Sequence, residues 1–222
     1  TKFRHIQIQN FTFHPSITKI YNGEKLAWLD TYQTTIPNHK AVITFYLADN
    51  QTDAADVLRY KQQVESDILM ALQTGDIAFD CLKIADIILY CQNHEVETVL
   101  KMFERMVADY AFIWIDFQYL MDVLKNSKAL YFQQSHAVGK DSILQVTKQI
   151  FEQRNLPNAK AILTCAVLPS DTGFEEVGEM DELMANSLSN QVDFYHAVNF
   201  EDKNELWNNG EKGCWLGVLF AR

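Results

Sequence analysis

Glycine is scarce in this chain of 222 residues: there are 8, and no two are adjacent. Average usage is roughly 7%, so the chain has about half the usual share. A phosphate-binding loop of the glycine-rich kind needs residues without a Cβ, because several backbone N–H groups must close on the phosphates at a helix N-terminus. The sequence contains no stretch of that composition.

Metal-binding and disulfide patterns are also missing. The four cysteines, Cys81, Cys91, Cys165 and Cys214, are widely spaced, and no Cys-x-x-Cys pair occurs. Reduced thiols in apolar, strand-like runs pack as small hydrophobes. The motifs Gly-x-Ser-x-Gly and His-Glu-x-x-His are absent as well. We therefore expect no metal, no cofactor and no recognisable catalytic centre.

Two further absences bear on location and partners. No window approaches 18 apolar residues, and the first residues contain no apolar stretch of signal-peptide length. We expect no membrane insertion and a cytoplasmic protein. The chain has 19 basic against 29 acidic residues, a formal net charge of −10, and no run of Lys or Arg that could follow a phosphate backbone. Nucleic acid is not an expected partner.

Apolar residues recur at the periods of both strands and helices. Residues 1–38 mix short alternating segments with turn residues, which predicts a β-rich start, and after residue 40 strand-like runs alternate with helical spacings. This alternation predicts an α/β fold whose sheet is largely parallel or mixed. The expected strands are 41–47, 85–91, 129–133, 159–167, 192–200 and 215–220, and the expected helices are 53–75, 93–113, 141–154 and 174–190.

Local signals refine two of these boundaries. Thr172 and Glu175 have the spacing of a capping box at the start of the last helix. Residues 207–213, Trp-Asn-Asn-Gly-Glu-Lys-Gly, have the composition of a tight turn. We expect this turn to join the last two strands in a β-hairpin.

A series of short motifs runs from Trp114 to the end of the chain. Residues 114–124 read Trp-Ile-Asp-Phe-Gln-Tyr-Leu-Met-Asp-Val-Leu, 129–132 read Ala-Leu-Tyr-Phe, and 137–141 read Ala-Val-Gly-Lys-Asp. The first resembles the FtsZ pattern Asn-Val-Asp-Phe-Ala-Asp-Val, and the next two resemble the strand and loop that lead to Gly-Glu-Asp in FtsZ. Residues 158–164, 174–177 and 218–221 continue the match in character. About half of the chain thus resembles the FtsZ/tubulin family.

The resemblance implies an α/β fold in three parts. These are a reduced, truncated Rossmann-like N-terminal part that lacks the nucleotide loop (1–92), a long central connecting helix (93–113), and an FtsZ-like C-terminal domain (114–222). The last would be a mixed four-stranded sheet with two helices. The alternative is an unrelated α/β sandwich with its elements in the same order, and fold analogy alone does not fix function.

The family's GTP-binding signature is absent from the place where it is expected. FtsZ uses a Gly-Gly-Gly-Thr-Gly-Ser-Gly loop, whereas residues 48–53 here read Ala-Asp-Asn-Gln-Thr-Asp. Asp49 and Asp53 would repel a triphosphate unless a metal intervened. A capped helix start is the main interpretation, and a metal-bridged nucleotide site is the alternative.

The resemblance also concerns the loop after the central helix. In FtsZ, the second aspartate of this loop helps to position the attacking water in the neighbouring subunit's site, and Tyr119 stands at the matching position. Asp116 matches the first aspartate, with a helix N-cap as its alternative role. Asp116, Phe117 and Tyr119 are therefore a candidate remnant of the family's subunit-contact loop. We expect no catalytic or nucleotide-binding residues and no enzyme.

Ser135 and His136 form a candidate ligand loop, because the polar ends of strands in α/β sheets often bind ligands. A solvated loop histidine is the alternative. The leading hypothesis for function is a non-catalytic FtsZ-like protein that acts through protein contacts, with itself as a homo-oligomer or with an FtsZ-type filament protein whose assembly it modulates or caps. The alternative is a small-molecule-binding protein or enzyme with a site between the subunits of an oligomer.

Overall fold

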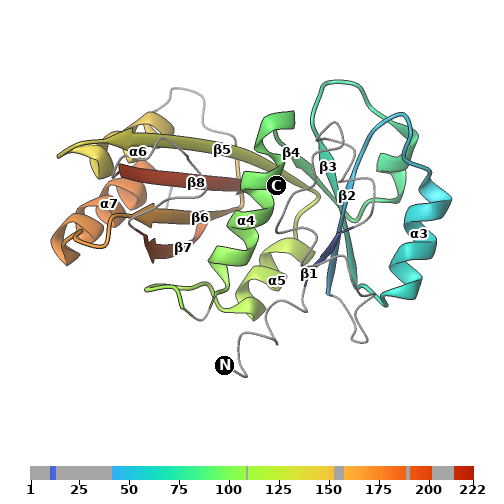
Figure 1. Cartoon of the computed structure of the whole chain (residues 1–222), viewed down its shortest axis with the longest axis horizontal. Coiled ribbons are helices and arrows are strands. Elements are labelled where there is room, and N and C mark those ends of the chain that lie inside the picture. The colour runs from blue at the N-terminus through green and yellow to red at the C-terminus, as the bar shows by residue number, and fades with distance from the viewer. Residues whose placement is uncertain (1–10, 14–41, 109, 153–157, 189–190, 202–212) are drawn as a thin grey trace. The chain divides into compact units, whose positions relative to one another are not determined.

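The computed structural model describes residues 11–13, 42–108, 110–152, 158–188, 191–201 and 213–222 (Figure 1). The chain divides into two compact units, Thr1–Val96 and Glu97–Arg222, called unit 1 and unit 2 below. Most of the β-rich start expected at 1–38 and most of the turn expected at 207–213 lie outside the described residues. The expected three-part division at residues 92 and 113 stays a prediction.

Unit 1 is built on parallel strands in the order β1-β2-β3-β4. Their bounds are Phe11–Phe13, Ile43–Leu47, Ile68–Gln73 and Ile87–Tyr90. Every residue of β2 and β3 is buried, as in central strands of a parallel sheet covered on both faces. Helix α3 (Ala54–Gln63) and the 3-10 turn η2 (Asp80–Ile84) pack on one face over Tyr46 and Leu69. The strands expected at 41–47 and 85–91 are confirmed.

The helix expected over 53–75 is wrong in its second half. Helix α3 ends at Gln63, the chain turns at Glu65 with a φ of 51°, and β3 begins at Ile68. Residues 68–72 are a short unbroken apolar run, which periodicity alone cannot assign to helix or strand. Burial on both faces between β2 and β4 decides for the strand.

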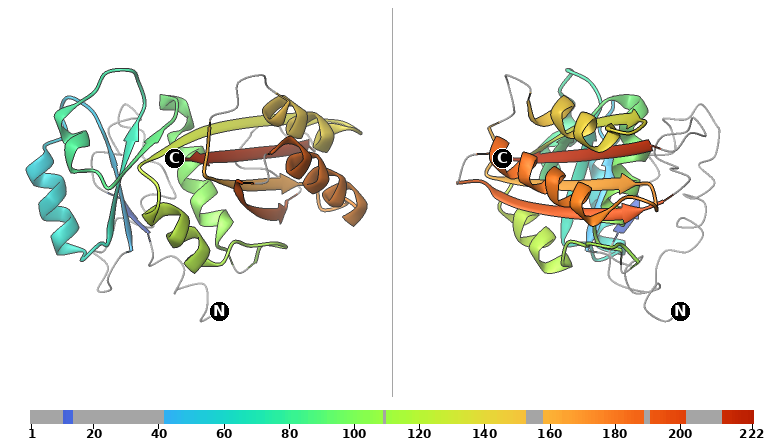
Figure 2. Two further views of the ribbon diagram at one scale, coloured as in Figure 1. Left: turned by 180° about the vertical axis from the view of Figure 1, so that it is seen from behind. Right: turned by 90° about the vertical axis from the view of Figure 1, so that its left-hand side faces the viewer.

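Unit 2 contains a mixed sheet in the order β5-β8-β6-β7. The strands are Ala129–Val138 (β5), Ala161–Leu168 (β6), Asp193–Phe200 (β7) and Gly213–Ala221 (β8), and β8 runs antiparallel to both β5 and β6. Helices α6 (Ser142–Phe151) and α7 (Phe174–Ser187) cover one face and close a core around Val146, Met180 and Phe220 (Figure 2). The mixed four-stranded sheet with two helices is confirmed.

Two local expectations in unit 2 are wrong. β7 pairs in parallel with β6, and β8 lies on the other side of β6, so β7 and β8 do not form the expected hairpin. The capping interaction of α7 is shifted by one residue, since the backbone N–H of Gly173 donates to Glu176 Oε2 at 2.8 Å. The turn composition at 207–213 gave no information about which strands pair.

The helix expected at 93–113 is shorter in the structure. A 3-10 turn, η3 (Asn93–Glu95), leads into α4 (Val96–Met106), and the Ile115 N–H donates to the Met106 carbonyl at 2.7 Å. Helix α5 (Phe117–Lys125) follows. Helices α4 and α5 lie on the face of the unit 2 sheet opposite to α6 and α7 (Figures 1 and 2). In the segment between α4 and α5, Ile113 forms an antiparallel bridge with Val198 on the outer edge of β7.

Candidate functional site

The loop that joins β2 to α3 satisfies its own hydrogen-bond donors. Asp49 Oδ1 accepts hydrogen bonds from the Gln51 N–H and from Thr52 Oγ1, both at 2.8 Å. Asp53 caps α3 by accepting from the Ala55 N–H at 3.0 Å. A carboxylate therefore already occupies the helix N-terminus, where a phosphate would otherwise be favoured. The capped helix start is confirmed.

The neighbouring loops at the carboxyl ends of the unit 1 strands are also closed by their own side chains. Gln73 Nε2 donates to the carbonyls of Gly75 and Ile77, at 2.5 and 2.7 Å. The Gln92 N–H donates to Glu95 Oε2 at 2.7 Å. Within the described residues, no group of three or more His, Cys, Asp or Glu side chains could hold a metal ion. Three backbone N–H groups of these loops, at Gln51, Ala55 and Gln92, are thus bonded to nearby carboxylates.

The predicted remnant of the subunit-contact loop lies at the start of α5. Asp116 is the N-cap, and its Oδ1 accepts from the Gln118 N–H at 2.7 Å. Phe117 is half-buried, whereas Tyr119 is 56% exposed and stacks on Tyr195 of β7 with ring centroids 5.8 Å apart. Asp116 therefore has the structural role that the sequence left open. Tyr119 presents an aromatic ring where the resemblance leads one to expect a carboxylate.

The segment before α5 carries further exposed aromatic rings. Tyr110, Phe112 and Trp114 are 55, 44 and 56% exposed, and they alternate with Ala111, Ile113 and Ile115, which are buried or half-buried. Ile113 lies at the centre of the buried set and forms the bridge to Val198 of β7. The period-2 run Tyr-Ala-Phe-Ile-Trp-Ile is visible in the sequence, but sequence reasoning missed it because a helix was expected there.

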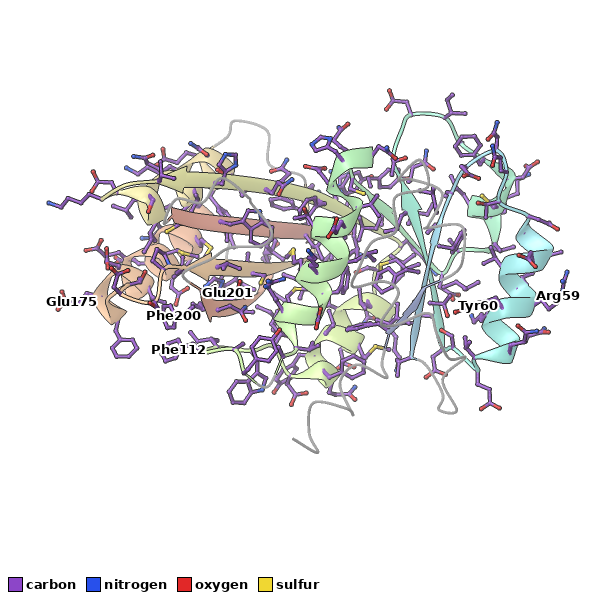
Figure 3. All side chains as sticks on the ribbon, viewed as in Figure 1. Arg59, Tyr60, Phe112, Glu175, Phe200 and Glu201 are labelled. Atoms are coloured by element: carbon purple, nitrogen blue, oxygen red, sulfur yellow. The ribbon has the colours of Figure 1, made fainter. Side chains whose placement is uncertain are left out.

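Phe174, at the first position of α7, joins these rings. It is 72% exposed and stacks on Phe112 at 5.3 Å, and Phe112 also contacts Phe200 at 5.1 Å. Figure 3 shows Phe112 and Phe200 near each other, with Glu175 on α7. We call the five exposed rings the aromatic surface: Tyr110, Phe112, Trp114, Tyr119 and Phe174. Four of the eight large hydrophobic side chains exposed in the described part of the chain fall within residues 110–119, so they are clustered in the sequence, and their ring contacts reach α7 at Phe174 and β7 at Tyr195 and Phe200.

A buried ion pair supports the base of this surface. Arg105, in the last turn of α4, donates through Nε and Nη2 to Glu201 Oε1 and Oε2 at 3.0 and 3.2 Å. Only 8% of the Arg105 side chain and 23% of the Glu201 side chain are exposed. The pair connects the end of α4 to the residue that follows β7. The Ile113–Val198 bridge joins the same two parts of the chain.

The prediction of a ligand loop at Ser135 and His136 is wrong, because both residues lie inside β5. Ser135 pairs with Leu216 and His136 with Trp215 of β8. Ser135 is buried, and its Oγ donates to Gln149 Oε1 of α6. The strand extends beyond 133 because the polar residues Gln133–Gln134 still pair with β8. These positions do not form a ligand loop.

A polar cluster in the interior of unit 2 has the chemical order of a hydrolase triad. Thr164 Oγ1 lies 2.5 Å from His196 Nδ1, and His196 Nε2 lies 3.5 Å from Asp181 Oδ1. Burial lowers the pKa of His196 to about 3 and raises the pKa of Asp181. Thr164 is 0% exposed, so a substrate cannot reach its hydroxyl. The cluster joins β6, β7 and α7, with Asp181 at its solvent-accessible end.

The thiols are poor nucleophiles. Burial raises the pKa of Cys165 and of Cys91 to about 12, and the pKa of Cys214 to about 11. A thiol with such a pKa is protonated at neutral pH, and the thiolate is the reactive form. All four cysteines are free, and Cys81, Cys165 and Cys214 are buried.

In the part of the chain that the structure describes, no helix has the length and apolar character needed to span a membrane. Neither a protein-family model nor a curated protein matches the sequence. Solved structures do match. A mutant FtsZ of M. jannaschii has a TM-score of 0.63 at 10% identity, covering 82% of this chain and 65% of that one. CetZ of Methanosaeta thermophila has a TM-score of 0.55 at 9% identity, covering 82% and 61%.

CetZ2 of Haloferax volcanii gives a TM-score of 0.52 at 14% identity, covering 87% of this chain and 67% of that one. The chain spans less than two thirds of the length of the FtsZ and Methanosaeta CetZ structures. Likeness at this level of identity concerns the fold. The arrangement expected from the motifs after Trp114 is thereby confirmed, and the chain has the fold of the FtsZ/tubulin family.

Proposed function

We propose that this chain is a non-catalytic protein of FtsZ/tubulin-like fold that acts in the cytoplasm through protein contacts, by self-association or by modulating the assembly of an FtsZ-type filament. It hydrolyses no GTP. The contact region is the aromatic surface of unit 2. The observation that carries the proposal is the exposure of five aromatic rings in that unit, each between 44 and 72%.

Exposed rings of this kind are costly unless a partner covers them. Full burial of a large apolar side chain is worth about 1.5–3 kcal/mol. Trp and Tyr are enriched among the residues that dominate binding energy at protein interfaces, and the surface contains Trp114, Tyr110 and Tyr119. Contact among Phe112, Phe174 and Phe200 holds part of this surface in a fixed shape before binding.

The chemistry of unit 1 supports the absence of GTP hydrolysis. The loop at 48–53 has no glycine, and its Asp49 and Asp53 accept hydrogen bonds from the backbone N–H groups of Gln51 and Ala55. A triphosphate would have to displace both carboxylates and tolerate their charge. At the start of α5, Asp116 is engaged as an N-cap and Tyr119 cannot act as a carboxylate base.

The structural neighbours support the choice of protein contacts. One neighbour is an FtsZ dimer of M. jannaschii, and the CetZ2 structure is a protofilament. By analogy of fold, a chain that keeps the sheet and helices of unit 2 can present a contact surface of the same kind. We therefore place self-association and an FtsZ-type partner ahead of a small-molecule ligand.

Two measurements on the full chain test the proposal. Calorimetry with GTP and Mg²⁺, together with phosphate release, is expected to show neither binding nor turnover. Light scattering of an FtsZ-type protein during assembly, and sedimentation of the chain alone, are expected to show an effect of the wild-type chain in at least one of the two. Trp114→Ala combined with Phe174→Ala removes that effect, because it truncates two rings of the contact surface.

A matched control exists in unit 1. Ile77 is 68% exposed, so Ile77→Ser removes a comparably accessible apolar side chain that is not one of the five rings, and it should leave assembly unchanged. Micromolar GTP binding with turnover would overturn the non-catalytic part of the proposal. Equal behaviour of the Trp114/Phe174 variant and the wild type in both assays would overturn the assigned surface.

A further inference from the structure

The segments that carry the aromatic surface contain only acidic charged residues. Its rings lie on or against three segments, 110–124, 171–187 and 193–201, which contain two, six and two acidic residues and no Lys or Arg. The basic residues nearest to these segments in sequence are Lys125, which directly follows the first, Lys203, two residues after the last, and Arg105, which is held by Glu201. A partner for this surface therefore meets apolar rings on segments that carry carboxylates.

The carboxylates are close to the rings in space as well as in sequence. Partial burial and then Asp193, with a smaller effect of Asp122, raise the pKa of Tyr195, the ring on which Tyr119 stacks. Partial burial of the Tyr110 hydroxyl and the nearby Glu104 carboxylate raise the pKa of Tyr110. Glu175 follows Phe174 directly in the first turn of α7. Acidic groups thus accompany the rings at several points of the surface.

An aromatic ring beside a carboxylate is a good receptor for a guanidinium or ammonium group. The ring face attracts the cation, the carboxylate pairs with it, and arginine can do both at once. The chain already contains one such stack, since the Arg222 guanidinium carbon lies 4.8 Å from the centroid of the Tyr131 ring. The aromatic surface offers the same kind of ring, and its three segments contain no Lys or Arg that could stack on it.

A second copy of the chain matches this surface poorly. The chain has a formal net charge of −10, and the loops at the carboxyl ends of the unit 1 strands carry Asp49, Asp53 and Asp76. Like charges across an interface oppose association. We propose that the aromatic surface binds a different protein through a segment in which arginine or lysine is interleaved with apolar residues. This inference rests on the proposed function and specifies the chemistry of the partner.

Two synthetic peptides of equal length provide the probe. One alternates arginine with leucine, and the other has glutamate in place of each arginine. Calorimetric titration of the full chain is expected to show binding of the arginine peptide at least about tenfold tighter than binding of the glutamate peptide. The affinity should fall on going from about 0.05 to about 0.5 M NaCl, because salt screens exposed charges.

Variants separate this surface from the general acidity of the chain. Glu175→Gln with Glu179→Gln removes two exposed carboxylates from α7, and Trp114→Ala removes one ring. Each is expected to weaken binding of the arginine peptide by about fivefold or more. Asp56→Asn with Asp76→Asn removes the same charge from exposed positions of unit 1 and should change the affinity by less than about twofold.

The outcomes also distinguish this inference from the proposed function. Equal weakening by the α7 pair and the unit 1 pair would show non-specific attraction and overturn the inference. Self-association that depends on Trp114 and grows with salt, or equally tight binding of the glutamate peptide, would also overturn it while leaving the proposed protein contact intact. Only the absence of any Trp114-dependent binding or assembly effect would count against both.

Discussion

The β2–α3 loop of unit 1 and residues 110–119 of unit 2 differ in how far their exposed groups are covered by contacts within the chain. In unit 1, the loop between β2 and α3 has its N–H groups at Gln51 and Ala55 bonded to carboxylates of the same loop. In unit 2, residues 110–119 leave four aromatic rings exposed to solvent although alternate residues of the same segment are buried. The first loop bonds N–H groups within itself, and the second segment leaves apolar rings in contact with solvent.

A phosphate site and a contact surface depend on different parts of a fold. A phosphate site depends on a few unbonded N–H groups in one loop, so a change to residues that bond those groups internally removes it. A contact surface depends on side chains spread over a segment, a helix and a strand edge, and on the rigid elements beneath them. The buried Arg105–Glu201 pair belongs to that supporting structure.

Breaking this pair should have the largest effect. Glu201→Gln leaves the Arg105 guanidinium buried without a full counter-charge, and removing one partner of a buried pair typically costs roughly 3–5 kcal/mol. We expect a loss in the free energy of unfolding near the lower end of that range, because Glu201 is partly exposed. Urea unfolding followed by circular dichroism measures it.

The exposed pair in unit 1 is the control. Asp56 and Arg59 are 3.5 Å apart and both more than half exposed, so Asp56→Asn should cost less than about 0.5 kcal/mol. If Glu201→Gln were as mild as Asp56→Asn, the aromatic segment would not depend on this pair.

Two glycines give the next contrast between the units. A Cβ at Gly217 in β8 would collide with the Trp215 ring and lie 2.8 Å from Met102 Sδ, and Trp215 is held by its Nε1 donating to Gln134 Oε1 at 2.9 Å. We expect Gly217→Ala to cost about 1–3 kcal/mol of unfolding free energy through overpacking. Gly75 has nothing within 4 Å of the corresponding position, so Gly75→Ala should be nearly neutral. Equal thermal midpoints for the two variants would contradict the close packing of Trp215.

The sequence predicted best those features that rest on local periodicity. Most strands and helices of unit 2 appear within a few residues of their expected places, and Asp53 and Asp116 act as the helix caps that their positions suggested. Helix caps and apolar periodicity depend on residues that are close together in the chain, so they can be recognised in a single sequence. The mixed sheet followed from the order of motifs after Trp114.

Features that depend on contacts between residues far apart in the chain could not be predicted from local patterns. Residues 68–72 became β3 because β2 and β4 cover both of its edges, and β7 and β8 are separated because β6 lies between them. The helix from 96 ended at Met106 because residues 112–113 bond to Val198, which is far away in sequence. The aromatic surface was missed for that reason, although its alternating pattern is present in the sequence.

The interior of unit 2 should make stability depend on pH. Burial lowers the pKa of His196 from 6.5 to about 3, so between these values the unfolded state binds a proton that the folded state does not. The free energy of unfolding should therefore fall as the pH drops below about 6.5, by up to about 2 kcal/mol at pH 5. The raised pKa of Asp181 acts in the opposite direction at the acid end and reduces this loss.

Urea unfolding at several pH values between 7 and 5 measures this dependence. His196→Gln removes the titrating ring and should flatten the curve, whereas His94→Gln, at an exposed position, should keep the slope that His196 causes. An unchanged slope in His196→Gln would mean that other groups produce the dependence.

The smallest expected change in stability comes from removing the N-cap of α3, Asp53, in the loop between β2 and α3. Asp53→Ala removes the acceptor of the Ala55 N–H and should cost about 1 kcal/mol, whereas Asp53→Ser restores a capping oxygen and should recover most of that loss. Thermal unfolding of the three chains gives the comparison. Because the Gln51 N–H can still donate to the Asp49 carboxylate, we expect Asp53→Ala not to bind GTP in calorimetry. GTP binding by this variant would show that a single cap is what keeps the loop from accepting a nucleotide.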